Sequence, residues 1–103
     1  MLVLTTCGSA ADADALAAAL VDSKQAACVS RLERVRSTYR WEGAVETDDE
    51  VVVLIKTTEA RLAAVQDTVH AMAKYELPEF LTVRVESGSA AYLSWLGSAV
   101  GEG

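Results

Sequence analysis

The chain has 103 residues, of which 51% are hydrophobic and 23% are charged, a composition typical of one folded domain. Its 15 acidic residues outnumber the 9 basic ones and give a formal net charge of −6. This balance argues against a nucleic-acid partner, because binding to phosphates needs a basic face.

The two cysteines and the N-terminal residues indicate in which cellular compartment the protein resides. Cys7 and Cys28 form neither a disulfide framework nor a Cys-x-x-Cys zinc motif. The N-terminus lacks the basic segment of a signal peptide, and no apolar run approaches the roughly 20 residues of a membrane span. We therefore expect a single domain over residues 1–103 that resides in the cytoplasm and has no membrane partner.

The N-terminal quarter predicts one strand and one helix. Apolar residues at 3–6 predict the strand. The alanine-rich stretch 9–24 predicts the helix, with Ser9 at its N-cap and Asp12 three residues later, the spacing of a capping box. Ala13, Leu16, Ala17 and Leu20 recur with helical period and predict its buried face.

Residues 27–57 change to a β pattern. Thr-Asp-Asp at 47–49 predicts the turn between two strands. The continuous apolar run at 50–57 predicts a central strand that is covered on at least one face and paired on both edges.

The last third predicts a helix, a strand and a further helix. Residues 58–74 carry one apolar face, and Pro78 ends that element. Residues 80–88 alternate, which predicts a half-exposed strand whose Leu81, Val83 and Val85 point inward. Ser89 is placed to cap a short C-terminal helix. The order β-α-β-β-α-β with a final helix predicts an α+β, ferredoxin-like split βαβ fold.

His70 is the only histidine, so any serine–histidine–carboxylate arrangement would have to use it. It lies about 120° from the centre of the apolar stripe of its helix, at roughly 100° per residue, which predicts a solvated side chain. No phosphate-binding glycine loop is present either. We therefore expect no enzyme and no catalytic residue.

Three aromatic residues extend beyond what a compact sheet of this size needs. Tyr39, Trp41 and Trp95 would be exposed, and exposed aromatic residues usually mark an interface. They could instead cap the core of a monomer. We favour the interface, because a long hairpin also leaves edge strands that need partners.

Several spaced motifs resemble those of the CutA family of divalent-cation tolerance proteins, in order and over nearly the whole chain. The blocks are Ala26-Ala27-Cys28, the pattern Ser37-x-Tyr39-x-Trp41-x-Gly43, Glu50 before an apolar strand ending in Lys56-Thr57, Tyr75–Glu79 and Tyr92–Leu96. The resemblance implies a ferredoxin-like subunit in a tight homotrimer, similar in architecture to the trimeric PII-type signalling proteins. It also implies a non-enzymatic role in tolerance of divalent metals such as copper, with no required cofactor.

One position departs from the family pattern. The family commonly has a histidine two residues before the tyrosine of its His-x-Tyr-x-x-Pro-Glu block, and here that residue is Ala73. The histidine usually invoked for copper is therefore absent. The remaining candidate ligands are Cys28, Glu50, Tyr75 and Glu79.

Two alternatives are weighed against this interpretation, and the first of them stays open. A PII-like trimeric sensor would bind a small ligand in clefts between subunits, lined by Tyr39, Trp41, Lys56 and arginine residues, with Trp95 at the interface. An acylphosphatase-like hydrolase would need an arginine in the first loop and a suitably placed amide. That loop has no arginine and the chain has no asparagine, so we set the hydrolase aside.

Overall fold

The computed structural model describes residues 1–102. Its elements are β1 (Leu2–Cys7), α1 (Ala10–Asp22), β2 (Cys28–Trp41), β3 (Ala44–Lys56), a 3₁₀ turn (Glu59–Arg61), α2 (Leu62–Met72), β4 (Leu81–Val83) and α3 (Ala90–Ala99). The sheet order is β2-β3-β1-β4, with antiparallel neighbours throughout. This confirms the predicted split βαβ fold.

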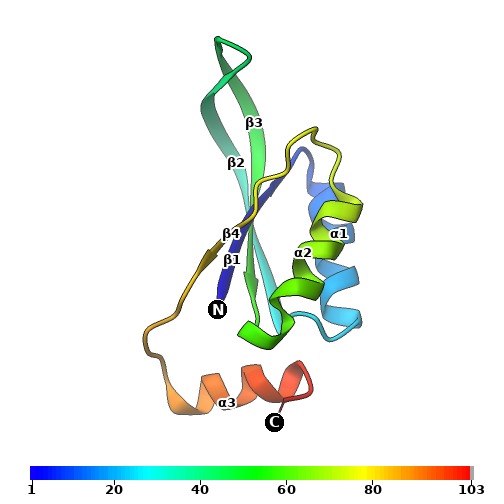
Figure 1. Ribbon diagram of the computed structural model, residues 1–103. Coiled ribbons are helices and arrows are strands. Elements are labelled where there is room, and N and C mark those ends of the chain that lie inside the picture. Colours follow the sequence, from blue (N-terminus) through cyan, green and yellow to red (C-terminus); the bar gives the residue numbers. More distant parts are fainter. Residues whose placement is uncertain (103) are drawn as a thin grey trace.

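In Figure 1, α1 and α2 cover one face of the sheet and α3 lies beyond its lower end. No helix within residues 1–102 has the length and apolarity needed to cross a bilayer.

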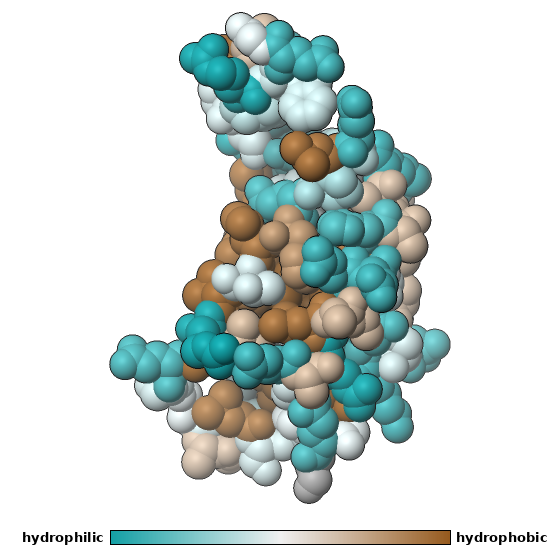
Figure 2. All heavy atoms as spheres, in the orientation of Figure 1, coloured by the Kyte–Doolittle hydropathy of each residue, from teal (hydrophilic) through white to brown (hydrophobic). Residues whose placement is uncertain are grey.

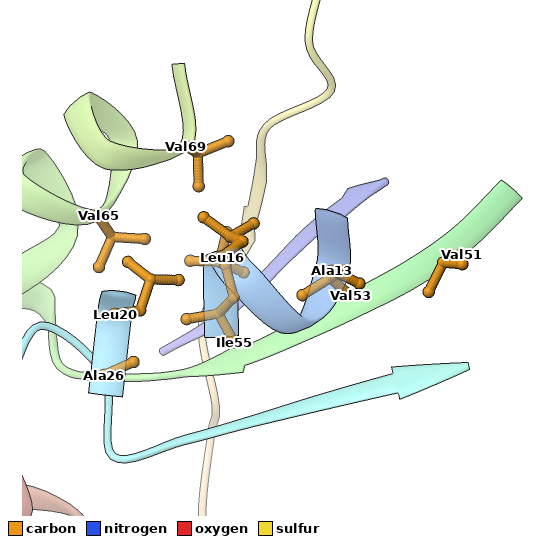
Figure 3. Packing of buried hydrophobic residues seen from close by; sticks show 10 residues of the cluster. Ala13, Leu16, Leu20, Ala26, Val51, Val53, Ile55, Val65 and Val69 are labelled. Carbon is orange, nitrogen blue, oxygen red and sulfur yellow. The ribbon is translucent and has the colours of Figure 1, made fainter. Parts of the chain in front are cut away.

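The core lies between the sheet and the two covering helices. Val53 and Ile55 of β3 are fully buried, and Figure 3 shows Leu16, Leu20 and Val65 converging on the same side of that strand. The apolar run at 50–57 is thus the predicted central strand, with β2 on one edge and β1 on the other. Its side chains alternate between buried and half-buried, because helices cover only one of its faces.

The helix caps follow the sequence. Ser9 Oγ accepts a hydrogen bond of 3.1 Å from the Asp12 amide, which satisfies one of the free donors at the start of α1. Ser89 Oγ accepts one of 3.2 Å from the Tyr92 amide at the start of α3. Both predicted N-caps are confirmed.

The predicted turn at 47–49 is wrong. The chain reverses at Glu42 and Gly43, whose φ angles are 49° and 82°, and Trp41 pairs with Ala44 across the turn. Two successive positive φ angles make the two-residue hairpin turn whose twist matches that of the strands. Residues 47–49 continue β3 instead. These residues are exposed in β3, so water solvates their polar side chains without a turn. Asp49 also lies 3.8 Å from Arg36 on the paired strand.

The predicted inward orientation of the last strand is also wrong. Leu81, Val83 and Val85 are 57%, 46% and 45% exposed, and only residues 81–83 form strand. Leu81 pairs with Leu4 and Val83 with Leu2. Directly paired residues share a face, and this is the face opposite the buried Val3, where no helix lies.

We call this uncovered surface the open sheet face. Its apolar members are Leu2, Leu4, Val52, Leu54, Leu81 and Val83. In Figure 2, brown apolar side chains gather between the projecting hairpin above and α3 below. Exposed apolar area that is contiguous in this way marks an interaction surface.

Candidate functional site

Three of the four predicted ligands meet where the loop after α2 crosses the end of β1 and the middle of β3. Tyr75 Oη donates a hydrogen bond of 2.7 Å to Glu50 Oε2. Thr5 Oγ1 donates one of 2.6 Å to the backbone oxygen of Glu79, which ties the loop to β1. The loop exists because α2 ends at Met72 and Ala73 is already extended, at φ −65° and ψ 141°. The helix thus ends before the predicted Lys74, and Pro78 keeps the following residues from resuming it.

This loop and the β2–β3 hairpin enclose an open surface cavity of about 550 Å³. Its lining residues are Thr6, Ser37, Thr38, Tyr39, Arg40, Trp41, Glu50, Tyr75, Glu76, Leu77 and Glu79. We call it the hairpin cavity. It combines three carboxylates and three aromatic side chains with a single arginine, in the size range of small-molecule pockets.

Burial and neighbouring negative charges raise the pKa values of side chains that line the hairpin cavity. Burial, followed by the neighbouring Glu50 carboxylate, raises the pKa of Glu79. Burial, followed by the hydrogen bond to Glu50, raises the pKa of Tyr75. The hydrogen bond to Asp48 raises the pKa of Tyr39 to about 12. Both phenols therefore remain protonated at neutral pH and act as donors to carboxylates.

Cys28 lies far from the other three predicted ligands. It is opposite Lys56 in the β2–β3 register, whereas Glu50 is six residues farther along β3, about 20 Å at the usual rise per residue. Cys28 is too distant to share an ion with Glu50, Tyr75 and Glu79 within one chain. Across residues 1–102, no group of three or more His, Cys, Asp or Glu side chains is arranged to hold a metal.

The single histidine lies outside the cavity, as its helical position predicts. His70 is exposed and packs edge-on against Phe80, with ring centroids 6.0 Å apart. Ala73 lines a separate cavity of about 70 Å³ together with Cys7, Asp12 and Tyr75.

Sequence reasoning missed Cys7 as a neighbour of this small cavity. The thiol is half-buried, and burial followed by the Asp12 charge raises its pKa. Its place at the end of the first predicted strand, directly before the first helix, was the available signal.

The residues predicted to line an interface separate into two groups. Tyr39 and Trp41 line the hairpin cavity, and Tyr39 is 40% exposed. Trp95 lies on α3, is 47% exposed and packs against Tyr92 in a tilted arrangement, with ring centroids 5.4 Å apart. Lys56 lies at the end of β3 remote from the hairpin tip and does not line the cavity with Tyr39 and Trp41.

The chain combines a ferredoxin-like sheet with an elongated β2–β3 hairpin, an uncovered apolar sheet face and a third helix at the end of the sheet. These features define its class as an α+β protein of the ferredoxin-like fold. The chain belongs to the CutA1 divalent ion tolerance protein family, whose model matches residues 1–99. The divalent-cation tolerance protein CutA of Thermus thermophilus is 36% identical over 100 residues, covering 97% of each sequence. Protein CutA homolog of Xenopus laevis is 36% identical over 97 residues, or 94% of this chain.

The length of the relatives differs. The chain spans 64% of the Xenopus protein, 49% of the rice chloroplastic protein CutA 1 and 51% of human protein CutA. Among solved structures, CutA from Xylella fastidiosa superposes with a TM-score of 0.94 at 36% identity, covering 96% of this chain and 95% of the other. The Thermus thermophilus structure gives 0.90 at 37% identity, with 92% of each chain covered.

Proposed function

We propose that this chain works as a non-enzymatic homotrimer in tolerance of divalent metal ions such as copper. The observation that carries the proposal is the family match over residues 1–99, since relatives of near-equal length bear the name divalent-cation tolerance protein. A cytoplasmic location agrees with the two free thiols, because structural disulfides are rare in that compartment.

The trimer is supported by the open sheet face. A soluble monomer rarely leaves a contiguous apolar strip on the face of a sheet, and here Leu81 and Val83 are about half exposed. Burying this strip against other copies would remove it from water. The projecting β2–β3 hairpin, whose outer residues lie beyond the helices (Figure 1), would then extend over a neighbouring subunit.

The metal chemistry is limited by the donors present. Glu50, Tyr75 and Glu79 offer oxygen atoms only, and Tyr75 is already bonded to Glu50. Copper(II) prefers imidazole and other nitrogen donors, whereas carboxylates suit harder ions. Within one chain these residues do not fit a resident copper site, so we expect weak, exchangeable binding of divalent ions.

Calorimetric titration with Cu²⁺ and Mn²⁺ tests this point. We expect Kd values above roughly 10 µM for the unmodified chain, and further weakening in a Glu50→Gln, Glu79→Gln double variant. Cys28→Ser is the matched control and should change neither titration. Nanomolar copper binding that survives the double variant would contradict this choice of ligands.

A second candidate function is a PII-like sensor of a small ligand, and the hairpin cavity favours it. The cavity has the volume of a small-molecule pocket and an aromatic wall of Tyr39, Trp41 and Tyr75. A thermal-shift screen of nucleotides, small anions and amines tests it. A shift that disappears in Trp41→Ala but persists in Trp95→Ala supports the sensor, and the absence of any shift counts against it.

A further inference from the structure

A second cluster of reactive side chains lies at the opposite end of the sheet from the hairpin cavity. Lys56 Nζ is 3.8 Å from Cys28 Sγ and 3.4 Å from Ser30 Oγ, and Cys28 Sγ is 3.9 Å from Ser30 Oγ. All three side chains are half-buried. An amine and a thiol, the two strongest nucleophiles among protein side chains, are therefore in direct contact.

Backbone pairing fixes this contact. Cys28 and Lys56 are directly opposite each other in the β2–β3 register, and Ser30 follows two residues later on the same face. Within residues 1–102, no carboxylate forms an ion pair with Lys56, while five of the eight other lysine and arginine side chains have one. The ammonium group is thus directed to the thiol and the hydroxyl.

Cys7 cannot react with Cys28 within the chain. Cys7 pairs with Val51, whereas Cys28 pairs with Lys56, so five residues of β3 separate them, about 17 Å. A disulfide needs Cα atoms within about 7 Å. An oxidised Cys28 therefore has Lys56 Nζ, and no thiol, as its intramolecular nucleophile.

We propose that Cys28 and Lys56 form a redox-sensitive cross-link site, in which hydrogen peroxide joins Sγ of Cys28 to Nζ of Lys56. The thiolate first attacks peroxide. An S–O bond forms, the O–O bond breaks, and the departing hydroxide takes up the proton that the thiol released and leaves as water. Sulfur is thereby oxidised by two electrons to a sulfenic acid. The unprotonated Lys56 amine then attacks sulfur. An S–N bond forms, the S–O bond breaks, and the hydroxyl leaves as water with a proton from nitrogen.

The balance is one thiol, one amine and one peroxide giving one sulfenamide and two waters. Thiol reductants return the pair to its starting state, since sulfenamides belong to the reversible part of the cysteine oxidation series. The link would join β2 to β3 where the hairpin begins and would remove a positive charge from the open sheet face, where Lys56 pairs with Leu2. It would constrain the unfolded chain as a disulfide does, so the melting temperature should rise on oxidation.

Mass spectrometry of the full chain after treatment with equimolar peroxide tests the site. We expect the loss of two hydrogen atoms per chain, no tryptic cleavage after Lys56, and a fragment in which Cys28 and Lys56 are joined. Dithiothreitol should restore all three readouts. Cys7→Ser and Lys74→Arg are the matched controls and should still form the link.

Lys56→Arg is the decisive variant, because it keeps the charge and the donors but lacks a nucleophilic amine. We expect no link there, and instead a sulfenic acid that dimedone traps. The proposal is overturned if Lys56→Arg loses the same two hydrogens, or if the unmodified chain gains only oxygen atoms while trypsin still cleaves after Lys56. A covalent dimer through Cys28 would overturn it too. Should Lys56→Arg not fold, the fragment map of the unmodified chain and Cys28→Ser decide the question.

Discussion

The carboxyl of Glu79 shows how one residue of the loop after α2 depends on its surroundings. Burial and the nearby Glu50 raise its pKa in the folded chain, so folding favours the protonated form. The ionised form therefore weakens the fold, and this cost appears as the pH rises from the ordinary glutamate pKa through the raised one.

Glu79→Gln should therefore increase the free energy of unfolding at pH 7 by about 0.5 kcal/mol or less, since this side chain is only partly withdrawn from water and solvent screens its charge. At pH 3.5 the two proteins should be equally stable, because Glu79 is then protonated. Urea denaturation at both pH values measures the difference. A stabilisation that persists at pH 3.5 would show that charge is not its cause.

Ala73 carries the second prediction at this scale. It lines the small cavity beside Cys7 and Asp12, so Ala73→His would add an imidazole to a thiol and a carboxylate. We expect at least a tenfold gain in affinity for Cu²⁺, about 1.4 kcal/mol. Calorimetry compares it with Ala71→His, two residues earlier in the sequence at an exposed position of α2. Equal gains in both variants would mean that the cavity contributes nothing.

The candidate site could be predicted only in part. Glu50, Tyr75 and Glu79 were chosen from motifs, and the structure brings them together because the loop after α2 returns to β1. Cys28 also stands in a motif, Ala26-Ala27-Cys28, and was grouped with them as a possible soft ligand. Its register position opposite Lys56 depends on where the hairpin turns, which the sequence did not indicate correctly.

At the scale of elements, the hairpin shows which local signals are decisive. Thr-Asp-Asp at 47–49 contains residues that favour turns, yet the turn forms at Glu42 and Gly43. A glycine that can adopt positive φ outweighs polarity, because the two-residue turn requires that geometry. The polar residues remain in β3, since both faces of the hairpin are solvated there.

Two glycine-to-alanine variants separate backbone geometry from packing. A Cβ atom would meet no neighbour within 4 Å at either Gly43 or Gly97, but Gly43 has φ +82°. Gly43→Ala should destabilise the hairpin tip by about 1 kcal/mol. Gly97→Ala, inside α3, should stabilise the chain by about 0.5–1 kcal/mol. Amide hydrogen exchange at Arg40 and Val45 measures the effect of Gly43→Ala, and thermal unfolding measures the effect of Gly97→Ala. If both variants changed stability in the same direction, backbone geometry would not be what distinguishes the two glycines.

The last strand shows why alternation alone does not identify the buried face. The pattern of residues 80–88 was read correctly as alternating, but the apolar set lies on the open sheet face. Alternation shows that the two faces differ, and only the positions of α1 and α2 show which face this chain covers by itself.

At the scale of the whole molecule, the order of elements was predictable because each strand and helix carries its own period and caps. The long hairpin was expected from the length of the β segment at 27–57, whereas the uncovered face was not, because alternation does not show on which side of the sheet α1 and α2 pack. A single chain does not cover either the projecting hairpin or the open sheet face with its own residues. Together they make assembly the property of the molecule that most needs measurement.

Leu81→Lys tests assembly through the open sheet face. Leu81 is 57% exposed, so an isolated chain should tolerate lysine there, whereas a trimer that buries this face would have to desolvate the charge. We expect light scattering to give the mass of three chains for the unmodified protein and of one chain for Leu81→Lys. The melting temperature should rise with protein concentration only in the former. Val21→Lys, an exposed position near the end of α1 on the other side of the sheet, should remain trimeric. If Leu81→Lys stays trimeric as well, the chains associate through another surface.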